Sequence, residues 1–245
     1  MAKIAIIAAL EREVAPLLRT GSWSRQSLSG VDGACYENDI AVVACAGIGG
    51  VAAGRMAEAL IAGYKPALVV SAGLAGALTP AGKVGQVICP AVVICAGKAV
   101  PVEVASPPEI AGLRQAGTLV TASRVSGAEE KRSLARQYSA DALDMEAAAV
   151  AEVAAAHGLA FMAVKAISDE YNFPMPNLDR FIDEQGRFQT GRFAFYIAFR
   201  PSMWRIVKKL ASNSGQASRD LCAELRVLID AESVSGRQEL SRAGA

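Results

Sequence analysis

Three acidic residues lie near the two ends of one otherwise apolar stretch of the chain. Asp144 and Glu146 open residues 144–173, and Asp169 lies close to the far end of that stretch. Carboxylates in such a setting act as general acids or bases, or accept hydrogen bonds from the hydroxyl groups of a ligand. The simpler alternative is that Glu146 favours a helix N-terminus and Asp169 caps a turn. On these residues alone both interpretations stay open.

The residues between these carboxylates predict the elements that position them. The alanine-rich segment ending at His157 and Gly158 predicts a helix, because alanine is the strongest helix former and glycine suits the position just past a helix end. Residues 159–167 predict a strand buried on both faces, and residues 140–143 predict a shorter strand. We expect a crossover with two parallel strands, which would bring Glu146 and Asp169 to the same carboxyl edge of a sheet.

Other predicted strand ends carry residues that suit the same edge. Residues 3–9 predict a central strand, and Glu13 follows it on a helix. Residues 40–46 predict a second strand, followed by a glycine-rich turn at residues 47–50. Residues 67–73 predict a third strand, followed by a second glycine-rich turn. Because glycine lets a backbone approach a ligand closely, these turns and carboxylates together predict one binding site.

Composition limits the classes of protein that remain. A chain of 245 residues with 52% hydrophobic residues suits one α/β domain, predicted here over residues 1–231, with a polar C-terminal tail at 232–245. The net charge of +1 predicts no binding to nucleic acid or to an anionic membrane. No apolar run approaches the ~20 residues of a membrane span. Five widely spaced cysteines without a C-x-x-C pair predict reduced thiols and a cytoplasmic protein.

Metal and redox chemistry find little support in the sequence. His157 is the sole histidine, so the chain lacks the material for a Ser-His-Asp triad or a multi-histidine metal site. Gly47, Gly49 and Ala52 fit a loose dinucleotide-binding fingerprint, but they do not follow the first strand and no acidic residue follows the next one. We therefore expect no metal and no cofactor, and we keep a dinucleotide-dependent oxidoreductase only as a competing class.

Four short motifs together resemble a known family. They are AALEREV at 8–14, AGIGGVAA at 46–53, SAGLAGAL at 71–78, and DMEAAAVA with KAISD between 144 and 169. In this combination the chain resembles the nucleoside phosphorylase superfamily, and within it the methylthioadenosine/S-adenosylhomocysteine nucleosidases of methionine salvage. The resemblance implies a single-domain, three-layer α/β/α fold around a central mixed, mostly parallel twisted sheet. It also implies a purine nucleoside substrate, a homodimer and no cofactor.

The resemblance also implies roles for individual residues. Asp169 would be the general acid that acts on the purine N7, Glu146 with Met145 would bind the ribose, and Glu13 would position or deprotonate the attacking water. Such an acid and carboxylate meet the charges that develop when an N-glycosidic bond breaks. Further substrate-binding residues would be Ala72, Gly73, Leu74, Val125 and Ser168. A water or phosphate site would be formed by Gly47, Gly49 and Arg55.

Departures from the family pattern leave the substrate and the reaction open. Leu74 stands where the nucleosidases carry serine, and Lys165 stands where they carry arginine. Val125 stands near the position where they carry an aromatic residue that stacks on adenine. The base and the 5′-substituent, including a bulky or hopanoid-type group, therefore stay open. Glu13 favours hydrolysis over a phosphate-dependent phosphorylase reaction, and a non-catalytic nucleoside-binding protein is a further alternative. The residues that keep phosphorolysis open are Arg12, Arg55 and Arg124.

Overall fold

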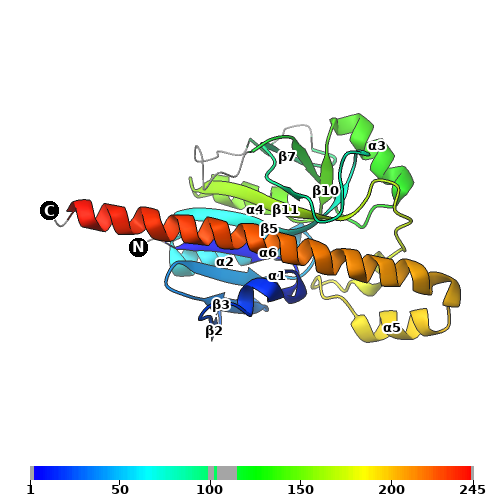
Figure 1. Ribbon diagram of the computed structural model, residues 1–245, viewed down its shortest axis with the longest axis horizontal. Helices are drawn as coiled ribbons and strands as arrows, with labels where there is room; N and C mark the ends of the chain where they lie inside the picture. The colour runs from blue at the N-terminus through cyan, green and yellow to red at the C-terminus, as the bar shows by residue number, and fades with distance from the viewer. Residues whose placement is uncertain (1–2, 99–101, 104–114, 244–245) are drawn as a thin grey trace.

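The chain folds around one mixed β-sheet with helices on both faces (Figure 1). The computed structural model describes residues 3–98, 102–103 and 115–243. Within these residues the sheet has eleven strands. The α/β class and the layered arrangement that the sequence predicts are confirmed.

The centre of the sheet is a group of buried parallel strands. β1 pairs with β4 on one side and with β5 on the other, and β5 also pairs with β11. Their valine, isoleucine and alanine side chains are buried on both faces, as expected for a parallel sheet covered by helices. The strands of this group are β1 (Ile4–Ala8), β4 (Ala41–Cys45), β5 (Leu68–Ala77) and β11 (Ala160–Asp169).

A second group of parallel strands meets the first from the opposite direction. β10 runs antiparallel to the end of β5, with Ala142 opposite Ala77 and Leu143 opposite Gly76. β9 and β7 continue this group in parallel. Short antiparallel strands complete the sheet. The strands beyond the central group are β2 (Ser24–Gln26), β3 (Ala34–Glu37), β6 (Val87–Ile88), β7 (Val92–Cys95), β8 (Val102–Glu103), β9 (Thr118–Thr121) and β10 (Ala142–Asp144).

The predicted parallel crossover between β10 and β11 is wrong. Both strands pair with β5, but β11 runs parallel to it and β10 antiparallel. The physical reason is the length of β5, which continues through the glycine-rich segment where the sequence predicted a turn. Its first nine residues pair with β11, and its last two still pair with β10. The carboxyl ends of the two strand groups therefore face each other, and a site forms between them.

Helices cover both faces of the central strands. Side chains of α2 and α4 pack with one face of the sheet, and those of α1 and α6 pack with the other. α3 covers the second strand group through Leu134, which packs near Val120 and Leu143. The helices are α1 (Glu11–Leu18), α2 (Gly50–Tyr64), α3 (Ala128–Tyr138), α4 (Ala147–Ala156), α5 (Thr190–Ala198) and α6 (Pro201–Ala243), with the short 3-10 helix η1 (Asp179–Phe181).

The C-terminal region of the described chain forms two helices of unequal length. α5 ends at Ala198, and one continuous helix, α6, runs from Pro201 to Ala243 (Figure 1). Proline suits the first position of a helix, because its missing N–H would have no partner there. Pro201 therefore starts a helix. In the described part of the chain no helix has the length and apolarity of a transmembrane span.

Candidate active site

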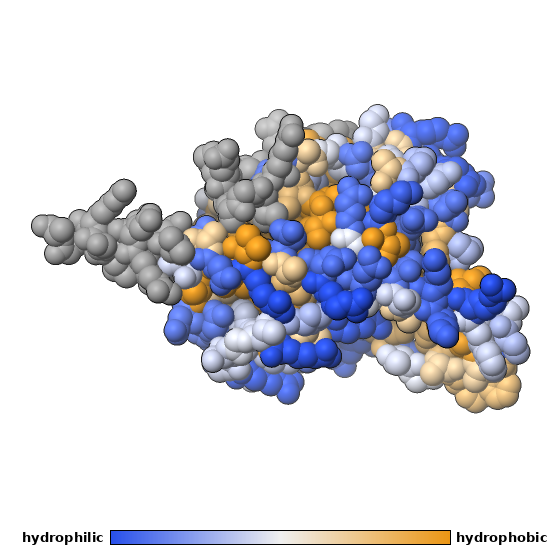
Figure 2. All heavy atoms as spheres, viewed as in Figure 1, coloured by the Kyte–Doolittle hydropathy of each residue, from blue (hydrophilic) through white to orange (hydrophobic). Residues whose placement is uncertain are grey.

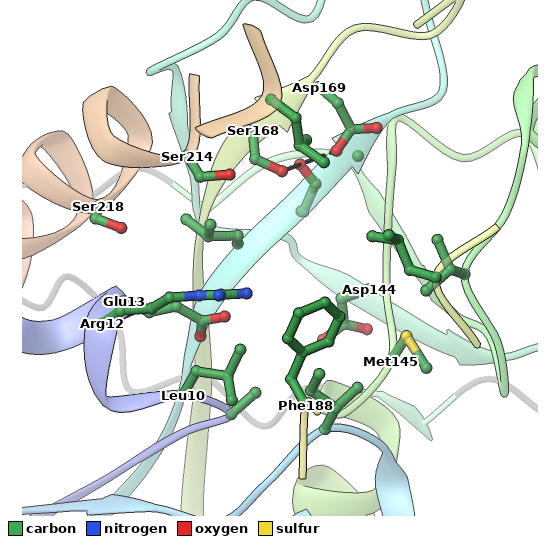
Figure 3. Close-up of a pocket in the computed structure, with 18 of the residues that line it drawn as sticks. Leu10, Arg12, Glu13, Asp144, Met145, Ser168, Asp169, Phe188, Ser214 and Ser218 are labelled. Carbon is green, nitrogen blue, oxygen red and sulfur yellow. Dashed lines mark hydrogen bonds between the residues drawn. The ribbon is translucent and has the colours of Figure 1, made fainter. Parts of the chain in front are cut away.

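A cavity of about 880 Å³ lies where the two strand groups meet (Figure 3). Its polar end is formed by α1, by α3 and the loop before it, by the junction of β10 and α4, and by the end of β11. Its remaining walls come from the segment after β11 and from α5 and α6. The ionisable residues at the polar end are Glu13, Lys131, Asp144, Glu146 and Asp169.

Glu13 enters the cavity from the first turn of α1, directly after β1. Its side chain is buried, and this burial raises its pKa to about 7, although Lys165 and Arg12 oppose the shift. Its Oε2 atom has no hydrogen-bond partner among the described residues. A buried, unpartnered carboxylate oxygen with a pKa near neutrality suits a group that accepts a proton from water.

Glu146 occupies the N-cap position of α4, just after β10. The backbone N–H of Gly49 donates to its Oε1 atom at 2.8 Å, and the N–H of Met145 donates to Oε2 at 3.3 Å. Burial, followed by repulsion from Asp144, raises the pKa of Glu146 to about 7. The carboxylate is thus fixed in place beside Met145, which also lines the cavity.

Lys165 supplies a positive charge beneath these carboxylates. Its Nζ lies 2.8 Å from Asp144 Oδ2 and donates to Ser71 Oγ at 3.0 Å. Burial alone would lower the pKa of Lys165, but Asp144 and Glu146 together raise it above its usual value. Lys165 is therefore charged at neutral pH and compensates part of the buried negative charge. A Cβ at Gly73, its cross-strand neighbour, would lie 3.1 Å from Glu13 Oε2.

Asp169 lies at the end of β11 and forms a buried ion pair with Lys131 of α3. Its Oδ1 accepts a hydrogen bond from Ser168 Oγ at 2.8 Å, and Lys131 Nζ also donates to the backbone oxygen of Glu170 at 3.1 Å. A Cβ at Gly76 would lie 2.9 Å from Lys131 Nζ and 3.0 Å from Asp169 Oδ2. Glycine at this position of β5 leaves the space that the ion pair occupies.

The structure separates the remaining predicted residues into two sets. Leu74, Val125, Met145 and Ser168 line the cavity. The other predicted residues are not part of the cavity wall formed by the described residues, and Arg55 is exposed on α2. That second set consists of Gly47, Gly49, Arg55, Ala72 and Gly73.

The amide groups of the first glycine-rich turn already have partners. The N–H of Gly47 donates to Ala9 O at 2.9 Å, that of Ile48 to Gly186 O at 2.7 Å, and that of Gly49 to Glu146. These three donors hold protein groups in place, so none of them points freely towards an anion.

The segment after β11 covers the cavity and contributes Met175, Leu178, Ile182 and Phe188 to its wall. It is tied down by the Ile48–Gly186 hydrogen bond and by the N–H of Val125, which donates to Asp179 Oδ1 at 2.9 Å. The guanidinium of Arg12 lies 5.4 Å from the centre of the Phe188 ring in the cavity (Figure 3). The apolar wall formed here and by α5 and α6 includes Met175, Leu178, Phe188, Phe193, Val207 and Leu210.

Comparison with known proteins decides the family. The model of the phosphorylase superfamily matches residues 3–112 and 111–191. The chain belongs to the phosphorylase superfamily. The resemblance predicted from the four motifs is confirmed, and this superfamily member is an enzyme of the N-glycosidase or nucleoside phosphorylase type. No curated protein matches the sequence.

Solved structures share the fold of this superfamily member at low sequence identity. The methylthioadenosine nucleosidase of Arabidopsis thaliana superposes with a TM-score of 0.73 at 18% identity, covering 95% of this chain and 96% of that one. The methylthioadenosine/S-adenosylhomocysteine nucleosidase of Helicobacter pylori has a TM-score of 0.71 at 17% identity, covering 94% and 98%. The futalosine hydrolase of H. pylori has a TM-score of 0.68 at 18% identity, covering 94% and 97%.

Lys131 and Phe188 line the cavity but are not among the site residues predicted from the sequence. Lys131 lies in α3, whose sequence is mostly polar and charged, and a lysine in such a helix is normally exposed. The spacing of residues in the sequence could have indicated its burial, since Lys131, Leu134 and Tyr138 share one helix face and Leu134 packs into the core. The chain offers no comparable pattern for Phe188, because it lies in an irregular segment.

Proposed function

We propose that this protein hydrolyses the N-glycosidic bond of a 5′-substituted purine nucleoside of the methylthioadenosine or S-adenosylhomocysteine type. The observation that carries the proposal is that Glu13, Glu146 and Asp169 reach one cavity from three different elements. Carboxylates on opposite sides of a nucleoside meet the charges that form as the bond breaks, positive on the sugar and negative on the base.

In the proposed reaction the leaving base receives a proton at N7 from the Asp169 side. Ser168 and Lys131 hold the Asp169 carboxyl group in place. The proton that moves to N7 belongs to the Lys131–Asp169 ion pair. Glu146 accepts hydrogen bonds from the ribose hydroxyl groups, in an orientation fixed by the N–H of Gly49. In its ionised form Glu146 accepts hydrogen bonds that are about twice as strong as neutral ones, so this contact stabilises the sugar as positive charge develops.

Glu13 completes the reaction by activating water. Its pKa of about 7 leaves a substantial fraction deprotonated at neutral pH, and its unpartnered Oε2 is available to accept the proton. The water adds to the anomeric carbon as the base departs, and its proton passes to Glu13. Ribose with its 5′-substituent and the free base are the products.

Hydrolysis is favoured over phosphorolysis because the hydrogen-bond donors of the first glycine-rich turn are not free to bind phosphate. The amides of Gly47, Ile48 and Gly49 bind protein oxygens, and Arg55 is exposed on α2 away from the cavity wall. The alternative is a phosphate-dependent phosphorylase acting on an adenosine with a bulky or hopanoid-type 5′-substituent. It is supported by Arg12 and Arg124, which line the cavity, and by the apolar wall beyond them.

Release of the free base, measured with and without phosphate, tests this proposal. Methylthioadenosine, S-adenosylhomocysteine, adenosine and inosine are the substrates to compare. We expect release from the 5′-thio nucleosides at the same rate with and without phosphate. Release that requires phosphate would establish the phosphorylase alternative. If no substrate loses its base but methylthioadenosine still binds, the protein is the non-catalytic nucleoside-binding alternative.

A further inference from the structure

Large aromatic side chains are exposed together on the hairpin of α5 and residues 201–210 of α6. Phe195 is 71% exposed, Phe199 70% and Trp204 52%. None of the residues of α5 is buried, although its sequence is mainly apolar. Single exposed apolar residues are ordinary, whereas a contiguous aromatic patch marks an interaction surface.

The same part of the chain is strongly basic. Residues 185–219 contain seven lysines and arginines and no aspartate or glutamate. Because the whole chain has a net charge of +1, all other residues together carry −6. The net charge of the whole chain predicted no anionic partner. That near-neutral net charge, however, includes one strongly positive region. Its basic residues are Arg187, Arg192, Arg200, Arg205, Lys208, Lys209 and Arg219. Arg187 is paired with Asp32 and Arg219 lines the main cavity, so the other five supply the charge of the hairpin itself.

Basic and aromatic groups are mixed on this hairpin. A shallow hollow of about 420 Å³ is lined by Arg192 and Arg200 together with Phe195 and Phe199. The two phenyl rings lie edge to face with centres 5.0 Å apart. Figure 2 shows hydrophobic residues gathered at the end of the molecule where Figure 1 places α5. Anionic phosphate groups and apolar chains would thus meet complementary groups side by side.

We propose that this hairpin docks onto the surface of a membrane that contains anionic lipids. Aromatic rings favour the boundary between headgroups and acyl chains, and basic residues near an anionic surface each add to the attraction. Neither contribution needs the helices to cross the bilayer, because an amphipathic element lies in the plane of the interface. Phe195 and Phe199 enter the interface, and the exposed basic residues of the hairpin, Arg192, Arg200, Arg205, Lys208 and Lys209, contact lipid phosphates.

A second copy of the chain is a poor occupant of this surface. A two-fold interface places the same patch on both partners, so the basic region of one copy would face the basic region of the other. Like charges brought together across an interface cost several kcal/mol. An anionic surface avoids this repulsion.

The position of the hairpin relative to the cavity also favours a lipid surface. α5 and α6 contribute Phe193, Val207 and Leu210 to the apolar cavity wall, while Phe195, Phe199 and Trp204 are exposed on the same helices. Docking would therefore place the bilayer beside the apolar end of the cavity, which suits exchange of an amphiphilic ligand. A polynucleotide partner offers no use for that apolar wall.

Binding of the full-length protein to sedimenting vesicles tests the proposal. Vesicles of phosphatidylcholine alone are compared with vesicles that also contain phosphatidylglycerol, at low and high ionic strength. We expect binding to the anionic vesicles only, weakened by salt. In the variant Phe195→Ser/Phe199→Ser, the affinity should fall by at least ~10-fold, because two apolar side chains no longer enter the interface.

Two further variants separate the two contributions and control for general effects. Lys208→Glu/Lys209→Glu should weaken binding to anionic vesicles and reduce its salt dependence. Val51→Ser is the matched control, because Val51 on α2 is also 71% exposed, and it should bind like the wild type. Trp204 is left unchanged, since its Nε1 donates to Ile197 O at 2.8 Å and joins α5 to α6.

Several outcomes would overturn the proposal. Failure of the wild type to bind anionic vesicles at low ionic strength would do so, as would unchanged binding of Phe195→Ser/Phe199→Ser. A dimer that dissociates in this variant would assign the patch to a second copy instead. Tighter binding to a single-stranded oligonucleotide than to vesicles would assign it to nucleic acid. Circular dichroism of each variant verifies that the fold is retained, and base release reports separately on the proposed activity.

Discussion

At the scale of single residues, two buried lysines organise the charges of the cavity. Lys165 contacts Asp144 and lies near Glu13 and Glu146, while Lys131 pairs with Asp169. A buried charge costs several kcal/mol unless it is paired, so each lysine permits carboxylates that the core could not otherwise hold. Lys165 offsets only part of the cost of burying the carboxylates, because burial still raises the pKa of Glu13 and of Glu146 to about 7.

Replacement of Glu13 by glutamine should slow hydrolysis strongly and change how stability depends on pH. A lost general base costs about 10²–10⁴-fold in rate. In the folded wild type the pKa of Glu13 is about 7, raised from 4.5, so the folded state binds more protons between these values. Wild-type stability therefore decreases as pH rises through this window, by an amount on the order of 3 kcal/mol. Because glutamine does not ionise, the Glu13→Gln variant should not show this contribution to the pH dependence of stability.

Urea unfolding of wild type and Glu13→Gln at about pH 5 and about pH 8 measures this effect. The variant should gain stability relative to the wild type at the higher pH. In the wild type, kcat/KM for base release should fall as pH drops below about 7, as Glu13 takes up a proton. A pH-independent difference in stability, or a loss of rate smaller than about 10-fold, would show that Glu13 is not the buried base.

Replacement of Lys131 by methionine should destabilise the protein and inactivate it. Removing one partner of a buried ion pair typically costs about 3–5 kcal/mol, because the other charge remains buried without compensation. The double variant Lys131→Met/Asp169→Asn removes both charges, so it should recover most of the lost stability and none of the activity. Thermal unfolding and base release distinguish the two effects. Equal stability of the single and double variants would mean that the pair is not coupled.

At the scale of elements, much of the fold could be predicted from local sequence signals. The strands and helices around Glu13, Gly49, Glu146 and Asp169 lie close to their expected positions. Strand direction and the course of β5 could not be predicted, because they depend on distant pairing. Gly76 lies in the predicted glycine-rich turn after residue 73, yet β5 continues through it to Ala77. A side chain at Gly76 would meet Lys131 and Asp169, so glycine there leaves room for the ion pair.

The long helix α6 holds α1, and with it Glu13, against the sheet. Arg226 Nη2 donates to Pro16 O at 2.6 Å, and Cys222 Sγ donates to Glu13 O at 3.4 Å. Leu221 and Leu225 are buried beside them in the same core cluster. The stability of this contact therefore governs the position of a catalytic candidate that lies more than two hundred residues earlier in the chain.

Replacement of Leu221 by alanine tests this clamp. We expect a loss of about 2–5 kcal/mol in unfolding free energy, from lost burial and the cavity left behind. Hydrolysis should also become more sensitive to temperature than in the wild type, since α1 loses its support. The control is Val227→Ala on the same helix, where the side chain is about half-exposed and the change should stay within about 0.5 kcal/mol. Equal effects of the two substitutions would contradict the clamp.

At the scale of the whole molecule, the cavity is assembled from parts that are far apart in the sequence. Its polar end comes from the two strand groups, and its apolar wall comes from the segment after β11 and from α5 and α6. The motifs could therefore predict the polar end, whereas the apolar wall consists of ordinary hydrophobic residues without a motif. The single domain at residues 1–231, the homodimer and the cytoplasmic location stay predictions.

The size and polarity of this cavity predict how substrates with different 5′-groups should behave. The cavity of about 880 Å³ continues from the carboxylates along Leu178, Phe193 and Leu210. In a series of 5′-alkylthioadenosines, each added methylene that is buried there contributes about 0.8 kcal/mol, so KM should fall about 4-fold per methylene. The turnover number should change little, because the added contacts are the same in the ground state and in the transition state.

Steady-state kinetics of base release along this series measures the effect, and Phe193→Ala provides the comparison that locates it. The variant should flatten the dependence of KM on chain length, because it removes a large part of the wall that the alkyl chain contacts. Methylthioadenosine, whose 5′-group is short, should be cleaved by wild type and variant with similar KM. A KM that is independent of chain length in the wild type would mean that the 5′-group leaves the cavity without touching this wall, and the apolar lining would then serve another ligand.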